Sequence, residues 1–282
     1  NDIQLSIESG FSGNLGANLR SEGQLKYLKA IEGGKSTLRS LDTPNSGEVD
    51  YSFNFKNDSL ELEDLKFRSG LNKFSGNGKL IGFKSKDPEI SFLVQASEFK
   101  TGETRNNFPL MLFPESFHKK INGVIDNGTL EIKSLQYTGS LKELKKFNLE
   151  ESKNRISAKV AFKKTDWHSP LPPFKKVTGF FEYKNDDGYI EIVEARFEDL
   201  PIANIKGTVK GVMNNPLADL SIESELDLGR LNHALKKSIS GKSFENILDD
   251  YQKVKGKGLL EAKLKVPLAE VEKFSVMAVL ST

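Results

Sequence analysis

The sequence predicts a mainly β fold: a long, curved antiparallel sheet of repeated strand-turn-strand units that forms a groove or a flattened barrel, with a few short helices. Three observations predict it. Apolar and polar residues alternate along many segments, Asn, Asp and Gly turns separate these segments, and one glycine and proline pattern occurs twice. Alternation with a period of two places apolar side chains on one face of a strand. Antiparallel sheets accommodate such one-sided strands.

The repeated pattern lies in the segments Gly78–Val94 and Gly207–Leu228. Two spaced glycines precede Asp87-Pro88 in the first segment and Asn215-Pro216 in the second. Apolar residues stand at the same two offsets after each proline: Phe92, Val94, Leu220 and Ile222. Such self-similarity is typical of stacked β units, because one unit needs neighbours to bury its apolar face.

Residues 1–44 are predicted to form partial N-terminal strands and one short helix. The helix is placed at Glu22–Ile31, where Leu25, Leu28 and Ile31 recur at helical spacing. Residues 45–121 are predicted to form the first β repeat unit, which ends in a short helix at Pro114–Ile121.

Residues 122–170 are predicted to form a second, shorter β unit, and residues 171–282 a third. The second unit contains the hairpin turn Asn127-Gly128, since Asn-Gly tolerates positive φ. The third contains a helical insertion at about 231–254, divided at Gly241. A change of parity at Ile192-Val193 predicts a β-bulge.

Composition argues against several classes of function. The 41 basic and 39 acidic residues give a net charge of +2, which is too weak a field to favour nucleic acid as a partner. The chain has no cysteine, and its histidines, His118, His168 and His233, lack a second ligand at metal spacing. No paired acid and base mark a catalytic pocket. We therefore expect no enzyme activity, no metal and no cofactor.

Alternation alone leaves two interpretations of the apolar strand faces. They could meet across a β-sandwich as ordinary core, or a long sheet could curl into an open trough whose inner face accepts lipid. Both arrangements place the same side chains inward.

Three segments resemble the AsmA-like bacterial envelope proteins, in particular the YhdP branch: Leu112–Leu144, Leu171–Leu228 and Gly256–Leu268. The similarity covers roughly residues 45 to 282 and lies in the pattern of glycine, proline and alternating apolar residues. It implies a periplasmic β-repeat protein, anchored in the inner membrane by a helix outside this chain. The implied function is to hold or conduct phospholipid in a hydrophobic β groove between inner and outer membranes, in support of outer membrane homeostasis.

The resemblance carries no catalytic residues. The expected partners are phospholipid or another acyl-chain lipid, the rest of a longer chain, and envelope proteins. Alternation assigns thirteen positions to the groove: Val49, Tyr51, Phe53, Phe55, Phe92, Val94, Val160, Phe162, Leu220, Ile222, Leu226, Leu260 and Leu264. The alternative is a structural or protein-interaction β module of the cell envelope that transports nothing and binds through an exposed sheet edge.

Overall fold

A computed structural model describes residues 2–12, 18–32, 35–40, 45–54, 58–69, 72–101, 125–146, 153–168, 174–212, 215–238, 255–268, 270, 273 and 275–281, with the backbone alone described up to residue 54. Within these residues, sixteen strands belong to one antiparallel sheet, and the strand order begins at β1 and ends at β16 without closing. The predicted fold class, a mainly β antiparallel sheet with a few short helices, is confirmed. Neither a closed barrel nor a pair of packed sheets is present in this part of the chain.

The chain divides into two compact units, and the division falls inside β9 and β10. The first unit holds β1 (Asp2–Ser12), β2 (Asn18–Glu32), β3 (Lys35–Ser40), β4 (Asn45–Asn54), β5 (Ser59–Ser69), β6 (Asn72–Ile81), β7 (Glu89–Lys100), most of β9 (Thr129–Ser140), α2 (Leu141–Lys146) and the start of β10 (Ile156–Trp167). Its strand order is β1-β2-β4-β5-β6-β7-β9, with β3 beside β2. The predicted division into four segments stays a prediction.

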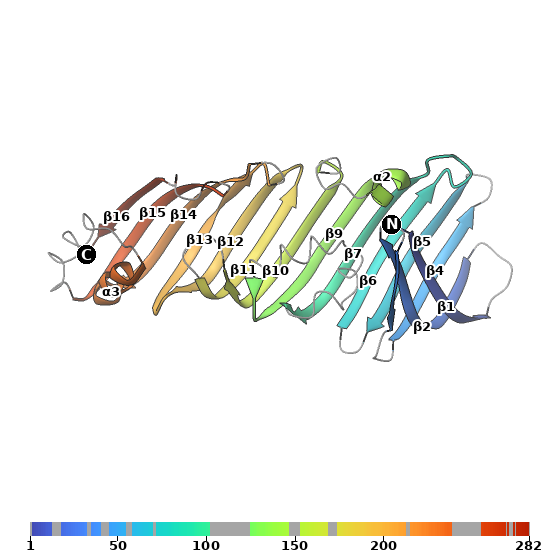
Figure 1. Ribbon diagram of the computed structural model, residues 1–282, viewed down its shortest axis with the longest axis horizontal. Helices are drawn as coiled ribbons and strands as arrows, with labels where there is room; N and C mark the ends of the chain where they lie inside the picture. The colour runs from blue at the N-terminus through green and yellow to red at the C-terminus, as the bar shows by residue number, and fades with distance from the viewer. Residues whose placement is uncertain are drawn as a thin grey trace. The chain divides into compact units, whose positions relative to one another are not determined.

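The second unit holds the rest of β10, β8 (Ile125–Asp126), β11 (Phe174–Lys184), β12 (Asp187–Phe197), β13 (Leu200–Lys210), β14 (Leu217–Asp227), α3 (Leu228–Ser238), β15 (Lys257–Pro267) and β16 (Ser275–Ser281). Figure 1 shows β11 to β15 lying side by side in chain order. Because each strand pairs with the next one in the chain, the apolar positions of neighbouring strands fall into register.

The two copies of the repeated pattern form equivalent hairpins, β6–β7 and β13–β14. Gly78 pairs with Phe92 in the first hairpin, and Gly207 pairs with Leu220 in the second. A side chain at Gly207 would overlap the carbonyl oxygen of Asp219 on the neighbouring strand. Gly78 and Gly207 are thus strand glycines beside the neighbouring backbone, whereas Gly82 and Gly211 follow the strand ends with positive φ.

Backbone hydrogen bonds around the two hairpins also repeat. In the first copy, the N–H of Gly82 donates to the carbonyl of Asp58 over 2.8 Å. In the second, the N–H of Val212 donates to the carbonyl of Asp186 over 2.9 Å.

The proline carbonyls occupy equivalent places as well. Pro88 accepts a hydrogen bond from Leu141, and Pro216 accepts one from Leu268, each over 2.8 Å. The sequence repeat is therefore a structural repeat that extends to the strand after each hairpin.

A bulge lies at the predicted place in β12. The register between β11 and β12 shifts between Gly179↔Ile192 and Thr178↔Glu194, which leaves Val193 as the extra residue. The equivalent strand of the first copy, β5, has a bulge at Glu63, between its pairs Tyr51↔Leu62 and Asp50↔Asp64. Such bulges re-aim the side chains and bend the strand.

The predicted helix at Glu22–Ile31 is wrong, because these residues form part of the strand β2. The register between β1 and β2 shifts at Lys26, so that Ile7 pairs with Leu25 while Leu5 pairs with Leu28. An extra residue in a strand changes the apolar spacing from two to three at that point. The sequence therefore shows a helix-like spacing inside a bulged strand.

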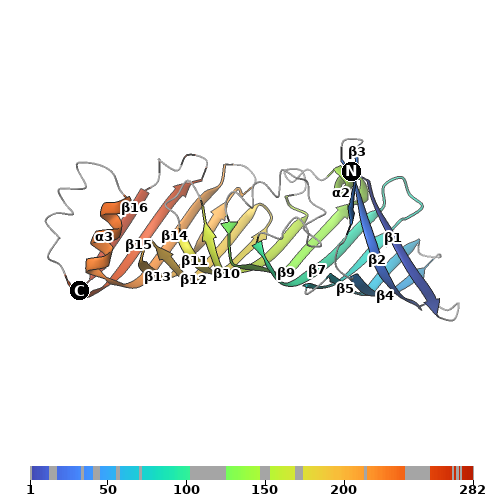
Figure 2. The same ribbon diagram turned by 60° about the horizontal axis from the view of Figure 1, so that its bottom comes forward.

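The helix α3 begins at Leu228, earlier than the predicted start at 231. Asp227 caps it, since its Oδ1 accepts a 2.9 Å hydrogen bond from the N–H of Arg230. α3 lies against the end of β13 and β14 (Figure 2), with Leu228 and Ala234 buried. Residues 239–254 of the predicted insertion and the predicted helix at Pro114–Ile121 lie outside the described residues.

Candidate functional site

The strongest candidate site is a continuous apolar surface on one face of β12 to β15. Strand register creates it, because directly opposed residues of an antiparallel pair share a face. One row across the strands is Ile190, Gly207, Leu220 and Leu264, and the next is Ile192, Ile205, Ile222 and Ala262. We call the following residues the unit 2 apolar face: Ile190, Ile192, Ile205, Leu220, Ile222, Leu260, Ala262 and Leu264.

β15 illustrates how one-sided these strands are. Leu260 and Leu264 are half-buried and Ala262 is buried. Leu259, which precedes Leu260 and faces the opposite side of the sheet, is 39% exposed. The opposite, wet face of β15 also carries the charged residues Glu261, Lys263 and Lys265, and Lys265 lies 3.8 Å from Asp219 of β14. Exposed pairs of this kind contribute about 0–1 kcal/mol. Burial of the apolar face therefore contributes more to the stability of this sheet than the exposed ion pairs do.

The unit 2 apolar face combines buried and half-buried side chains. At one end Val209, Ala218 and Val266 form a buried cluster, with Leu220 and Leu264 packed against it. At the other end, near α3, Leu226 is only 1% exposed. Between the ends, Ile192, Ile205 and Ala262 are buried. Four leucine and isoleucine side chains of β14 and β15 are half-buried: Leu220, Ile222, Leu260 and Leu264. No second sheet lies opposite them in the described part of the chain.

The register brings together five of the thirteen predicted groove positions, all in β14 and β15: Leu220, Ile222, Leu226, Leu260 and Leu264. Two more lie on β10 of the same unit, where Val160 is half-buried and Phe162 is 4% exposed. Phe162 packs edge to face against Trp167, with ring centroids 5.1 Å apart. Phe162 and Leu226 are thus core residues, while the others retain accessible surface.

Phe92 and Val94 lie on β7 of the first unit, both half-buried. They pair with Gly78 and Gly76, so their side chains stand beside residues that have none. Phe92 stacks on Tyr137 of β9, with ring centroids 5.7 Å apart.

Four predicted positions lie in or next to β4. Val49, Tyr51 and Phe53 belong to β4, of which the backbone alone is described, and Phe55 lies outside the described residues. The assignment of all thirteen positions to lipid contact stays a prediction.

Tyr137 marks the boundary between this apolar packing and the polar end of β9. Its side chain is 2% exposed, and its hydroxyl donates to the carbonyl of Ser140 over 3.0 Å. Burial raises the pKa of the Tyr137 phenol, and the nearby Glu143 carboxylate raises it further. The phenol therefore stays neutral and serves as a hydrogen-bond donor rather than as a base.

Asp166 is a carboxylate whose pKa departs from its ordinary value. Partial burial opposes ionisation, but hydrogen bonds from the backbone N–H of Lys176 and the side-chain amide of Asn127, each 3.0 Å long, lower the pKa of Asp166 below its ordinary value. These bonds tie the Asn127-Gly128 turn to β11. Asp166 therefore has a structural role where β10, β11 and the Asn127-Gly128 turn meet.

The described residues include no group of His, Asp and Glu side chains that would hold a metal ion. His168 lies 3.7 Å from Asp126, and both side chains are exposed. The described helices include none long and apolar enough to cross a membrane. The expectations of no enzyme activity and no metal stay predictions.

One polar feature was not predicted from the sequence: a pocket where α3 meets the turn between β12 and β13. The sequence signal for it was weak, because Arg196 and Arg230 lie far apart in the chain and no motif joins them.

No protein-family model, no curated protein and no solved structure matches the chain. The resemblance to the AsmA-like envelope proteins therefore stays a prediction.

Proposed function

We propose that this chain is a periplasmic segment of an AsmA-like envelope protein of the YhdP branch, and that its apolar strand faces hold or conduct phospholipid. In this proposal the inner-membrane anchor lies outside the chain, and transport runs between inner and outer membranes. The observation that carries the proposal is the unit 2 apolar face. Ile190, Leu220, Ile222, Leu260 and Leu264 are half-buried, the other three members are buried, and no second sheet in the described residues covers the face.

The energetics favour an acyl chain as the occupant of such a surface. Each CH₂ group that leaves water contributes about 0.8 kcal/mol, so one long acyl chain gains on the order of 10 kcal/mol. The face offers methyl and methylene groups along four strands and no charged side chain. It would therefore accept acyl chains without selecting among them, while the charged head groups remain in water at its edge.

Native mass spectrometry of the detergent-free protein after incubation with phospholipid vesicles tests the proposal. Leu220→Asp places a charge on the unit 2 apolar face, and we expect it to reduce bound phospholipid at least tenfold. Leu217→Asp is the matched control, because Leu217 lies on the wet face of the same strand and is 43% exposed. Equal lipid binding by both variants, or no phospholipid on the wild-type protein, would sink the proposal.

The alternative function, a protein-interaction module, is favoured by one observation. β16 ends the strand order, has no charged residue in Ser275–Ser281, and is exposed along its whole length. Val276, Met277 and Val279 are each at least 50% exposed. An uncharged apolar edge is a template for adding a strand from another chain. This alternative predicts protein association through β16 and no lipid uptake.

A further inference from the structure

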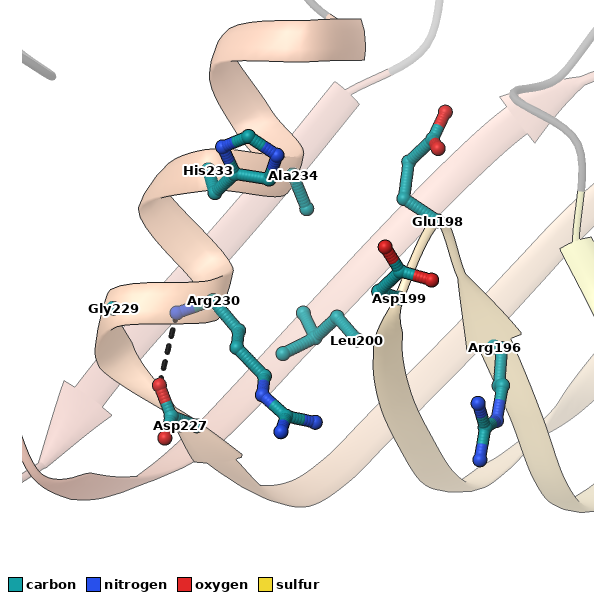
Figure 3. Close-up of a pocket in the computed structure, with 9 residues that line it drawn as sticks. All are labelled: Arg196, Glu198, Asp199, Leu200, Asp227, Gly229, Arg230, His233 and Ala234. Carbon is teal, nitrogen blue, oxygen red and sulfur yellow. Dashed lines mark hydrogen bonds between the residues drawn. The ribbon is translucent and has the colours of Figure 1, made fainter.

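A pocket of about 580 Å³ opens beside α3 in the second unit (Figure 3). Three segments build it: the end of β12 with its turn into β13, the last residue of β14, and the first turns of α3. The lining residues are Arg196, Glu198, Asp199, Leu200, Asp227, Gly229, Arg230, His233 and Ala234. Its volume lies in the range of ordinary small-molecule sites.

The base of the pocket is apolar and fixed. Leu200 is 1% exposed and Ala234 is 2% exposed. Asp227 holds the first turn of α3 through its hydrogen bond to the N–H of Arg230. Leu226, which precedes Asp227, is buried at the α3 end of β14, beyond Ile222 of the unit 2 apolar face. The pocket and the apolar face thus lie at successive positions along the same strand.

The charged side chains divide the pocket into two sides. Figure 3 shows the guanidinium groups of Arg196 and Arg230 and the carboxylate of Asp227 below Leu200, whereas the carboxylates of Glu198 and Asp199 lie above it. Neither guanidinium forms an ion pair or hydrogen bond with another described residue. Both arginine side chains are exposed. Guanidinium groups recognise phosphate oxygens through paired N–H donors.

We propose that this pocket binds the phosphoethanolamine group of a zwitterionic phospholipid. The guanidinium groups of Arg196 and Arg230 bind the phosphate, and the carboxylates of Glu198 and Asp199 bind the primary ammonium group. This assignment rests on the proposed function for its lipid source. It deepens that function by naming the head-group class.

Charge balance favours a zwitterion over a simple anion. The lining carries two arginines against three carboxylates, of which Glu198 also interacts elsewhere in the chain and Asp227 also caps α3, whereas Asp199 completes the set. A free phosphate dianion would meet a net negative charge in the lining. A phosphoethanolamine group instead offers its phosphate to the arginines and its ammonium to the carboxylates. Leu200 and Ala234 would contact the glycerol carbons.

Isothermal titration calorimetry of the full chain with glycerophosphoethanolamine tests the pocket without acyl chains. We expect binding by the wild-type protein and an affinity at least about tenfold weaker for Arg196→Gln and for Arg230→Gln, because each removes a charge-assisted contact. Lys263→Gln, on the exposed wet face of β15, should bind as the wild type does. Circular dichroism of each variant checks that the fold is retained, as expected for exposed arginines.

Two comparisons separate the sources of the ligand and the two proposals. Inorganic phosphate should bind at least tenfold more weakly than glycerophosphoethanolamine, and equal affinities would overturn the zwitterionic assignment. Co-sedimentation with phosphatidylethanolamine vesicles should exceed that with phosphatidylglycerol vesicles.

If glycerophosphoethanolamine binds but native mass spectrometry finds no phospholipid, the pocket stands and the apolar-face proposal fails. If phospholipid binds and the arginine variants change nothing, the pocket proposal fails alone.

Discussion

Glycine positions in this sheet are set by the approach of neighbouring backbones. At Gly207 a side chain would meet the carbonyl oxygen of Asp219, and at Gly179 it would meet that of Glu191. Both glycines sit opposite the bulky residues of the adjacent strand, Leu220 and Ile192. The spaced glycines thus let large apolar side chains occupy the face without crowding.

Gly207→Ala should lower the free energy of unfolding by about 1–3 kcal/mol, because the added methyl group forces the two strands apart. Urea denaturation followed by circular dichroism measures the change. Thr208→Ala is the control, since Thr208 is exposed on the wet face and its change should stay within about 0.5 kcal/mol. A Gly207→Ala variant as stable as the Thr208→Ala variant would contradict the close-approach explanation.

Asp166 provides a pH-dependent test at a single residue. Its pKa is lower in the folded state than its ordinary value of 3.8, so its contribution to stability is present above pH 3.8 and is lost as the pH falls through the folded pKa. Asp166→Asn should therefore destabilise the protein by about 1 kcal/mol at neutral pH, through the weakened bond to Asn127.

The expected pH profile distinguishes this carboxylate from a neutral packing residue. Urea denaturation of the wild-type and Asp166→Asn proteins should give stabilities that converge as the pH falls through the folded pKa of Asp166, because its carboxylate becomes protonated there. A gap of the same size at neutral and acidic pH would show that ionisation of Asp166 contributes nothing.

At the scale of elements, β2 shows how a bulge misleads sequence interpretation. Its leucines at positions 25 and 28 have the spacing of a helix face, but the extra residue between them restores the pairing with Ile7 and Leu5. Single-sequence periodicity does not separate one bulged strand from a short helix. Pairing with β1 and β4 decides the conformation, and pairing is a tertiary property.

The short helix α2 carries a local signal that periodicity overlooks. The hydroxyl of Ser140 accepts from the N–H of Glu143 over 3.2 Å, and the Glu143 carboxylate accepts from the N–H of Ser140 over 3.3 Å. This reciprocal pair is a capping box, which the sequence Ser-Leu-Lys-Glu encodes.

The hairpins around the two prolines were predictable because glycine, asparagine and proline restrict the backbone locally.

The edge strand β16 should make the chain associate with a second copy of itself. It carries apolar residues on both faces, no charge, and no described strand beyond it. Lysine is a common protection of exposed edges. The double variant Val276→Lys with Val279→Lys should therefore raise the dissociation constant of self-association at least tenfold in analytical ultracentrifugation.

The matched control for the edge is Leu217→Lys, an exposed leucine on β14, which is paired on both sides. It should associate as the wild-type protein does. A wild-type chain that remains monomeric at every concentration would remove the support for the interaction-module alternative.

For the whole molecule, the sequence predicted the class of fold and the one-sided strands, and it predicted that Leu220, Ile222 and Leu264 share a face. It left open whether that face meets a second sheet. The described residues form a single unclosed sheet, which removes the two-sheet sandwich within them. The pocket beside α3 was beyond prediction, because residues 196–200 and 227–234 meet only once β12, β13 and β14 are paired.

Photo-crosslinking from two adjacent positions of β15 tests most directly whether the apolar face contacts lipid. A photoreactive residue replaces Leu260, on the unit 2 apolar face, or Leu259, which faces water on the opposite side. After incubation with radiolabelled phospholipid vesicles, position 260 should crosslink to phospholipid and position 259 should not. Crosslinks from position 260 to protein alone, or equal lipid labelling at both positions, would contradict a lipid-holding face.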